Sequence, residues 1–375
     1  MNLVVLSQIH PSNRHVGFSV IHDFEHFLRS TLKPTFLYPL PNQSINVKLF
    51  KHYKFSDKGL AFLRRYRHRI FKSWYELSVP PAIEKIPNRD DPNVLLILGM
   101  TPDFLLSIHT LEAVLDQFDL KIAYLLDMSF ASHVDRSVAS LLDYVFVIST
   151  GFFDHSVTNL SFEIGVIPLG IDTCQVHYNR GHRPIDIFGY GRFEPSVHRV
   201  LQAHYNQSPQ LERIYLHSTF SGGEVESVTE HLALHSRLLS HTKISLCFEA
   251  SKSPRFQGAS PLLFRWLEGW LHGCVLVGKA PRDREVAPLM DWENSTLEIP
   301  DNLNDVVPFV EALLDNRHLL ETTSYRNYHE CCLRHDWAYR LRDMFNTVEL
   351  PIPEPITDRI RQLQSTNSVD NLVMS

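Results

Sequence analysis

Short apolar runs alternate with amphipathic stretches along nearly the whole chain. In the first half, six near-continuous apolar runs predict buried strands, at residues 3–7, 35–39, 94–98, 121–126, 144–149 and 163–168. Runs without polar alternation are typical of a parallel sheet that is covered on both faces. The amphipathic stretches between them, such as 18–32 and 103–115, predict helices. Strand and helix in alternation predict a doubly wound α/β domain.

A polar and aromatic segment interrupts this alternation at residues 169–184, where glycine and proline favour irregular structure. Apolar runs then resume at 185–191, 213–217, 243–248 and 274–280. We therefore expect two Rossmann-like, doubly wound domains that face a central cleft, with C-terminal helices. The expected parts are an N-terminal domain at 1–170, a linker at 171–184, a C-terminal domain at 185–348, and a C-terminal helix and tail at 349–375. Such sheets bind ligands beyond the carboxyl ends of their strands, so the cleft is the expected site.

Composition narrows the class of protein. The 375 residues suffice for two α/β domains, and the net charge of -6 argues against nucleic acid as a partner. No run of roughly 18 apolar residues occurs, and the first residues lack the basic start and cleavage site of a secretory signal. The five cysteines form no CxxC pair, so we expect reduced, structural thiols and no metal site. These features predict a cytoplasmic protein.

Residues 243–281 carry the clearest chemical signal, because a strand, a loop and a helix start follow one another there. Ser260 and Pro261 favour the start of a helix, and Gly273 favours its end, so we expect a helix over 262–272. The N-terminus of such a helix offers free N–H groups and partial positive charge to a phosphate group.

Arg265 and Glu268 share one face of this expected helix, because they are three residues apart. A cation there would meet a diphosphate, and a carboxylate one turn deeper would accept hydrogen bonds from the hydroxyls of a ribose. The alternative is an ordinary ion pair on a solvent-exposed face of the helix.

Three short sequences resemble elements of GT-B glycosyltransferases, in the order that the family has them. LEGWLHGCVLVG (267–278) resembles the donor-helix signature of the EAMACGxPVV type, in which a Glu and then a Gly precede an apolar strand. VIPLGIDT (166–173) resembles the element that closes the N-terminal domain, and FGYGR (188–192) resembles the Gly-Arg after the first strand of the second domain. The likeness covers residues 165–300.

By this resemblance, the C-terminal domain binds a UDP-sugar or GDP-sugar and the N-terminal domain binds the acceptor. Glu268 would hold the ribose, and Arg192 and Arg265 would act as catalytic cations on the leaving diphosphate. The other residues implied at the donor are Lys252, Arg255, Gly191 and Ser260. Many retaining members have a glutamate where this chain has Ser260, and that departure favours inversion. The family works without a metal and no DxD-like strand end occurs, so we expect no metal and no cofactor.

The loop after the first strand, at residues 7–19, is expected on the acceptor side. Its candidate contacts are His10, Asn13, Arg14, His15 and Gly17. The glycine would let the backbone approach a ligand closely. The alternative is a polar surface loop.

Asp127 ends the strand predicted at 121–126, where a carboxylate could deprotonate an acceptor hydroxyl. The run KIAYLLD resembles the strand that carries the catalytic Asp in phage DNA glucosyltransferases. Those enzymes also have an R-x-x-E in the donor helix, as Arg265 and Glu268 are here. The likeness concerns mechanism and not substrate, because this chain lacks the basic character of a DNA modifier. The alternative role of Asp127 is a helix N-cap.

A basic amphipathic stretch spans residues 51–75, with eight Lys and Arg residues against one acid and apolar residues in between. Such a stretch can lie on an anionic membrane, which predicts a peripheral contact with the inner membrane face. The alternatives are a solvated helix that packs on the core and a nucleic-acid contact.

The leading prediction is a glycosyltransferase, a hexosyltransferase by class, that moves a sugar from a nucleotide sugar to a hydroxyl of a glycan, glycolipid or small molecule. The alternative is a non-catalytic GT-B-like protein that binds nucleotides or serves as a scaffold. An NAD-dependent dehydrogenase is disfavoured, because no GxGxxG follows a predicted strand.

Overall fold

The structure is a computed structural model of the chain. It describes residues 1–10, 13–41, 75–77, 91–100, 102–127, 136–152, 161–191, 194–208, 212–218, 223–253, 256 and 258–373. The predicted residues Arg192 and Arg255 lie outside the described residues, and so does the basic stretch, apart from the backbone at Tyr75. The chain forms two compact units. The first unit comprises residues 1–13, 28–148 and 152–166, and the second comprises 14–27, 149–151 and 167–375.

The first unit is built on a parallel sheet of six strands in the order β2-β1-β5-β6-β7-β8. Its strands are β1 (Asn2–Ser7), β2 (Thr35–Leu37), β5 (Asn93–Gly99), β6 (Leu120–Leu125), β7 (Tyr144–Val147) and β8 (Glu163–Val166). All six strands were predicted from apolar runs. The sequence did not predict a further, short antiparallel pair of strands, which are β3 (Pro39–Pro41) and β4 (Tyr75–Leu77). The helical segments are η2 (Pro102–Leu111), η3 (Leu115–Gln117) and α5 (Arg136–Ala139).

The second unit is built on a parallel sheet of five strands in the order β10-β9-β11-β12-β13. Its strands are β9 (Ile185–Gly189), β10 (Tyr215–His217), β11 (Thr242–Phe248), β12 (Val275–Lys279) and β13 (Leu297–Glu298). The predicted runs account for the first four, and β13 was too short to recognise. The longer helices are α6 (Pro195–Leu201), α7 (Val228–Ser240), α8 (Phe264–Leu271), α9 (Leu303–Asp315), α10 (Arg317–Arg334), α11 (Trp337–Thr347) and α12 (Glu354–Val373). Most of α1 (Ser19–Thr31) also belongs to this unit.

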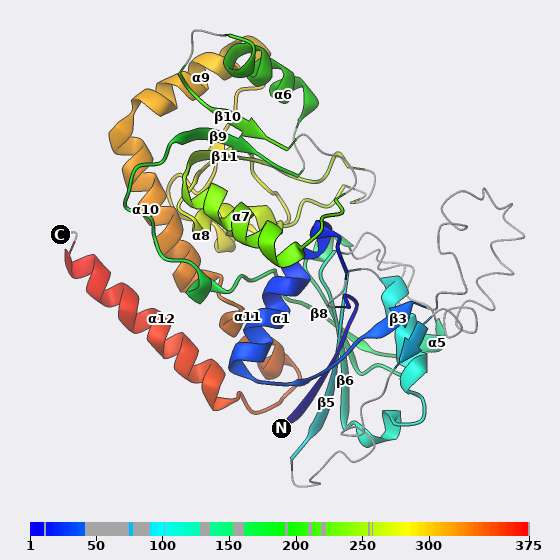
Figure 1. Ribbon diagram of the computed structural model, residues 1–375. Helices are drawn as coiled ribbons and strands as arrows, with labels where there is room; N and C mark the ends of the chain where they lie inside the picture. The colour runs from blue at the N-terminus through cyan, green and yellow to red at the C-terminus, as the bar shows by residue number, and fades with distance from the viewer. Residues whose placement is uncertain are drawn as a thin grey trace, which may run out of the picture. The chain divides into compact units, whose positions relative to one another are not determined.

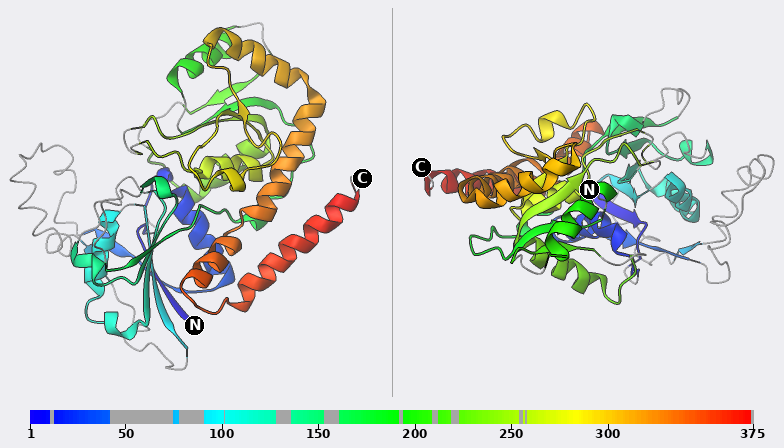
Figure 2. Two further views of the ribbon diagram at one scale, coloured as in Figure 1. Left: turned by 180° about the vertical axis from the view of Figure 1, so that it is seen from behind. Right: turned by 90° about the horizontal axis from the view of Figure 1, so that it is seen from above.

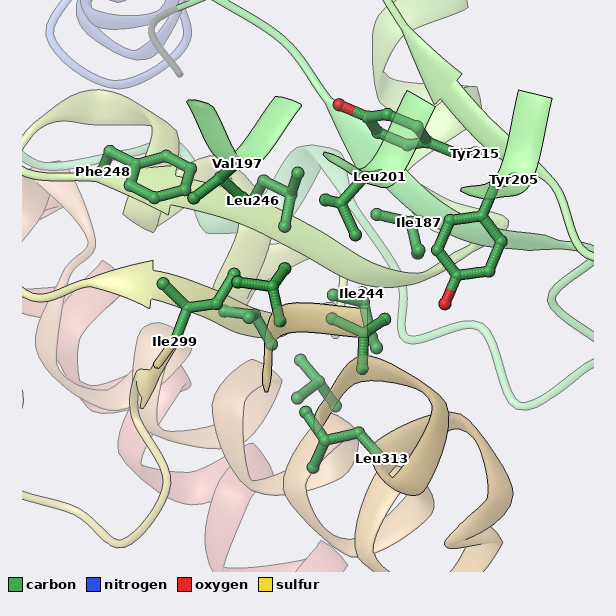
Figure 3. Packing of buried hydrophobic residues seen from close by; sticks show 14 residues of the cluster. Ile187, Val197, Leu201, Tyr205, Tyr215, Ile244, Leu246, Phe248, Ile299 and Leu313 are labelled. Atoms are coloured by element: carbon green, nitrogen blue, oxygen red, sulfur yellow. The ribbon is translucent and has the colours of Figure 1, made fainter. Parts of the chain in front are cut away.

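Helices cover both faces of the second sheet. Figure 1 shows α6 and α9 on one face and α7 and α8 on the other. Figure 3 shows the core between the sheet and the first pair, where Val197 and Leu201 of α6 and Leu313 of α9 meet Ile187 and Leu246 of the strands. This packing explains the near-continuous apolar runs of β9, β11 and β12, because both faces of these interior strands are largely buried.

Two predicted helices differ from those in the structure. The helix expected over 262–272 begins only at Phe264, because Ser260 does not cap it: its hydroxyl donates to Glu249 Oε2 instead, at 2.8 Å. The end was predicted correctly, since Gly273 follows the last turn with φ +66°. The stretch at 103–115 forms the 3₁₀ helix η2 and not an α-helix.

The C-terminal helix α12 is anchored by a buried ion cluster. Figure 2 follows this helix, drawn in red, towards the C-terminus. Arg359 Nη2 donates to Asp172 Oδ1 and to Asp336 Oδ2, both at 2.6 Å. Both carboxylates are buried, and Asp172 belongs to the VIPLGIDT sequence. Across the described residues, every helix is too short or too polar to span a bilayer.

Candidate active site

The candidate site lies where the strand order of the second sheet reverses. Strand β9 pairs with β10 on one side and with β11 on the other, which makes the carboxyl ends of β9 and β11 the place where doubly wound sheets bind ligands. Tyr190 and Gly191 follow β9, and Glu249 follows β11. Helix α8 brings Arg265 and Glu268 to the same place, beside Gly191 and Tyr190.

Tyr190 connects the end of strand β9 to helix α8. Its hydroxyl lies 3.2 Å from Glu268 Oε2 and 3.3 Å from the carbonyl oxygen of Arg265. Gly191 has φ +62°, and a Cβ there would lie 3.0 Å from Arg265 Nη2. A glycine is favoured here, because it adopts the left-handed backbone without strain and leaves room for the guanidinium of Arg265. The structure thus brings three residues predicted at the donor, Gly191, Arg265 and Glu268, into one cluster.

The electrostatics of this cluster are unusual for a surface helix. Burial raises the pKa of Glu268 to about 7, although the charge of Arg265 and the hydrogen bond from Tyr190 oppose the shift. Burial also raises the pKa of Tyr190 well above its usual value, so its hydroxyl remains a donor at neutral pH. Strongly shifted groups at a sheet reversal are typical of functional sites. The alternative of an ordinary solvent-exposed Arg–Glu pair does not fit, because Glu268 is partly buried.

Two histidines behind this cluster are neutral. Burial lowers the pKa of His272 and of His235 to about 4. The Nδ1 atom of His272 lies 2.7 Å from the carbonyl oxygen of Glu268, so it carries the proton, and Nε2 then accepts from the hydroxyl of Ser236 at 2.8 Å. His272 therefore joins the end of α8 to α7, and His235 packs edge-on against the ring of Tyr190.

Glu249 was not identified from the sequence. Its carboxylate accepts from the backbone N–H and hydroxyl of Ser251 at 2.5 and 2.6 Å, and from the hydroxyl of Ser260 at 2.8 Å. Burial opposes ionisation, but these hydrogen bonds outweigh it and lower the pKa of Glu249. The rule that ligands lie beyond strand ends would have found this residue, because it directly follows β11. A carboxylate is thus present beside Ser260.

Lys252 lies in the loop after β11, with its side chain 83% exposed, and its Nζ is 3.7 Å from Glu194 Oε2. Such an exposed pair contributes little to stability. Its role at a donor phosphate stays a prediction, and so do those of Arg192 and Arg255.

In the first unit, Asp127 is buried and lies just beyond the carboxyl end of β6, an interior strand. Its backbone N–H donates to the carbonyl oxygen of Met100 at 3.0 Å, and the N–H of Met100 donates to Gln8 Oε1 at 2.6 Å. The ends of β1, β5 and β6 are therefore linked at one edge of the sheet. This is the expected edge for a base, and the assignment of that role stays a prediction.

The residues predicted on the acceptor side divide between the two units. His10 and Asn13 belong to the first, where the ring of His10 packs edge-on against Tyr38. Arg14, His15 and Gly17 belong to the second. His15 Nδ1 accepts from the N–H of Gly17 at 3.0 Å, and residues 14–16 hydrogen-bond through their backbone to 223–225. Their contact with an acceptor stays a prediction.

Within the part of the chain that the structure describes, no group of three His, Cys, Asp or Glu side chains could hold a metal ion. All five cysteines are free thiols, and all except Cys174 are buried.

The comparisons with known proteins identify the fold. No family model matches this sequence, and no curated protein matches it. Among solved structures, an α-glucosyltransferase in complex with UDP and a 13-mer DNA containing a HMU base has a TM-score of 0.52 and 10% identity, over 95% of this chain and 99% of that one. HepE of Anabaena, in complex with UDP and glucose, has a TM-score of 0.50 and 12% identity, over 93% of this chain and 99% of that one.

The fold is of the GT-B type. This confirms the predicted fold class of two α/β units with parallel sheets, and the likeness runs over nearly the whole length of both chains.

Proposed function

We propose that this protein is a glycosyltransferase that moves a sugar from a nucleotide sugar to a hydroxyl acceptor, without a metal ion. The observation that carries the proposal is the cluster of Tyr190, Gly191, Arg265 and Glu268 at the reversal point of the second sheet. Support comes from the fold, which two UDP-bound proteins share. A UDP-sugar is accordingly the first donor to test.

The roles follow from charge and position. Glu268 accepts hydrogen bonds from the ribose hydroxyls, and its raised pKa means that a ribose which donates to it also favours its ionisation. Arg265, held beside the backbone of Gly191, faces the diphosphate and stabilises the charge that develops as this group leaves. The chain itself supplies a cation for the leaving group, so the proposed mechanism needs no metal.

Glu249 is proposed to contact the donor sugar. Its ionised carboxylate, fixed by Ser251 and Ser260, lies at the end of the strand next to β9. A carboxylate that accepts from two sugar hydroxyls orients the ring and distinguishes one sugar from another. Glu249→Gln is therefore expected to lower the affinity for a UDP-sugar and to leave that for UDP unchanged.

The test of the function has two stages. Calorimetry with UDP, GDP and ADP shows whether the chain binds one nucleoside diphosphate selectively. Incubation with UDP-glucose and related donors then shows whether UDP is released, and whether release accelerates with added glycan or glycolipid acceptors. Selective binding with no release for any donor and acceptor would favour a non-catalytic nucleotide-binding protein. If no nucleoside diphosphate binds, both the glycosyltransferase and the non-catalytic nucleotide-binding protein are contradicted.

Asp127 is proposed as the general base, which makes the transfer a single displacement with inversion. A positioned base contributes about 10²–10⁴-fold to the rate. Asp127→Asn should therefore bind UDP as the wild type does and lose activity by about that factor. The product should have an anomeric configuration opposite to that of the donor, as read by NMR. Retention of configuration, or an active Asp127→Asn enzyme, would leave Asp127 as a structural residue.

A further inference from the structure

A cavity of about 620 Å³ lies in the second unit, away from the candidate active site. Lys243, the second residue of strand β11, and Gly273, just before β12, form part of its wall. The cavity is therefore at the amino ends of the strands, whereas Glu249 and Gly191 follow their carboxyl ends. Residues 178–183 of the predicted linker form a second wall, and the first half of α10 forms a third.

The cavity carries uncompensated positive charge. Four of its lining side chains are cations at neutral pH, and one, Glu321, is an anion. Lys243 pairs with Asp186 at 2.6 Å, and Arg317 pairs with Glu321 at 2.7 Å. Arg180 and Arg183, in contrast, have no carboxylate partner in the described part of the chain. Two positive charges therefore remain for a ligand.

Arg183 is held in place before any ligand arrives. Its Nη1 donates to the carbonyl oxygens of Thr242 and His272, each at 2.9 Å, and its Nη2 donates to that of Asn179 at 3.3 Å. A guanidinium has five N–H groups, so these three bonds leave two for a ligand. Gly273 permits this arrangement, because a Cβ there would lie 2.8 Å from Arg183 Nη2. A fixed guanidinium binds an anion with little loss of side-chain entropy.

Part of the remaining lining is apolar and aromatic. The rings of Tyr178 and Tyr325 meet edge to face with centroids 5.4 Å apart, and Leu314 and Leu320 line the cavity from the side of α9 and α10. Ligand pockets are commonly about 300–1,000 Å³ with apolar walls and a few placed polar groups, and this cavity falls within that range. Arginine forks match the geometry of phosphate.

We propose that this cavity is a second ligand site, which takes a small phosphorylated compound with an aromatic or apolar body. The phosphate lies against Arg180 and Arg183, and the body packs between the tyrosines and the leucines. The site is independent of the proposed transfer reaction, because none of its lining residues belongs to the candidate active site.

The probe is AMP, which is titrated into the full chain by calorimetry. Inorganic phosphate is titrated in a separate experiment for comparison. AMP should bind at least tenfold tighter than phosphate, since the apolar walls contact only the former. Arg180→Glu should weaken AMP binding at least tenfold without affecting the fold, because the side chain is exposed and forms no hydrogen bond or ion pair within the described residues. Arg237→Glu, the same change at an exposed position on α7, is the matched control for net charge.

Hydrogen exchange with bound AMP should slow in residues 176–184 and 314–325. The variant Glu268→Ala should bind AMP as the wild type does, which separates this cavity from the donor site. The proposal is overturned if AMP does not bind at millimolar concentration. It is also overturned if Arg180→Glu and Arg237→Glu weaken AMP binding equally, or if Glu268→Ala abolishes AMP binding.

Discussion

The chemistry proposed at the donor site depends on one carboxyl group with an altered affinity for protons. Glu268 faces Tyr190 and Arg265 from within a partly buried helix face, and burial raises its pKa to about 7. A ribose that donates hydrogen bonds binds the ionised form more tightly. Nucleotide binding should therefore release a proton near neutral pH.

This coupling should make the affinity for UDP depend on pH. In the wild type, the affinity for UDP should fall about tenfold between pH 8 and pH 6, as Glu268 takes up a proton. Glu268→Gln keeps the shape but cannot titrate, so its affinity should be lower at pH 8 and should change less with pH. Calorimetry on both proteins removes the contribution of the UDP phosphate, which is common to them. An identical pH dependence in the two would remove Glu268 from the nucleotide site.

For single residues, the sequence predicted which residues belong to the candidate site better than it predicted their hydrogen-bond partners. Arg265 and Glu268 were identified because helix spacing and the family signature coincide. Tyr190 was not singled out, although it lies within the FGYGR sequence, because a tyrosine between two glycines has no pattern that indicates a hydrogen bond to a distant helix. Glu249 could have been found from its position after a predicted strand, but its contacts with Ser251 and Ser260 could not, because they depend on how the loop after β11 folds back.

At the scale of elements, strands were the most predictable feature. Ten apolar runs became strands, because parallel strands that are covered on both faces favour near-continuous apolar sequences. Helix starts were less predictable. Ser260 has the residue type of an N-cap, but it donates to Glu249, and its backbone N–H donates to Asp283 Oδ1 at 2.7 Å. Tertiary hydrogen bonds therefore moved the start of α8 to Phe264, which local preference could not indicate.

The anchoring of α12 gives a prediction at this scale. Arg359→Met should lower the free energy of unfolding by about 3 kcal/mol, because it leaves the buried carboxylates of Asp172 and Asp336 without their cation. The matched control is Arg361→Met on the same helix, whose ion pair with Asp358 is exposed on both sides. That change should cost no more than about 0.5 kcal/mol. Urea unfolding compares the two, and equal losses would contradict an anchoring role for Arg359.

At the scale of the whole molecule, two separate α/β units were predictable because each repeats the same alternation of strands and helices. The sequence could not predict that residues 14–27 and 149–151 belong to the second unit. These are short pieces of the first half of the chain whose contacts lie with distant residues. Trp337, for example, lies against Phe24 with ring centroids 4.4 Å apart, and its Nε1 donates to Asp23 at 2.6 Å. No local pattern records a pairing across more than 300 residues.

Asp23 makes the stability of the protein depend on pH. Burial raises its pKa to about 8, and the negative charges of Asp172 and Glu268 add to the shift. An unfolded aspartic acid has a pKa near 3.8, so the folded state binds one more proton than the unfolded state between these values. Protonated Asp23 therefore contributes its full stabilisation below pH 3.8. As the pH rises from 3.8 towards 8, the free energy of unfolding falls by at most about 1.4 kcal/mol for each pH unit.

Asp23→Asn should remove this loss. The N–H groups of Trp337 and Asp172 both donate to Oδ2, at 2.6 and 2.9 Å, so an amide oxygen can replace that atom while the amide nitrogen takes the place of the protonated oxygen. The variant should therefore match the wild type near pH 4 and exceed it by about 1–4 kcal/mol at pH 7. Asp358→Asn, at an exposed position of α12, serves as the control and should differ from the wild type by no more than about 0.5 kcal/mol. Urea unfolding at the two pH values measures the difference. A variant that is less stable than the wild type at pH 7 would mean that Asp23 is ionised in the folded protein, with its charge stabilised by Trp337 and the backbone.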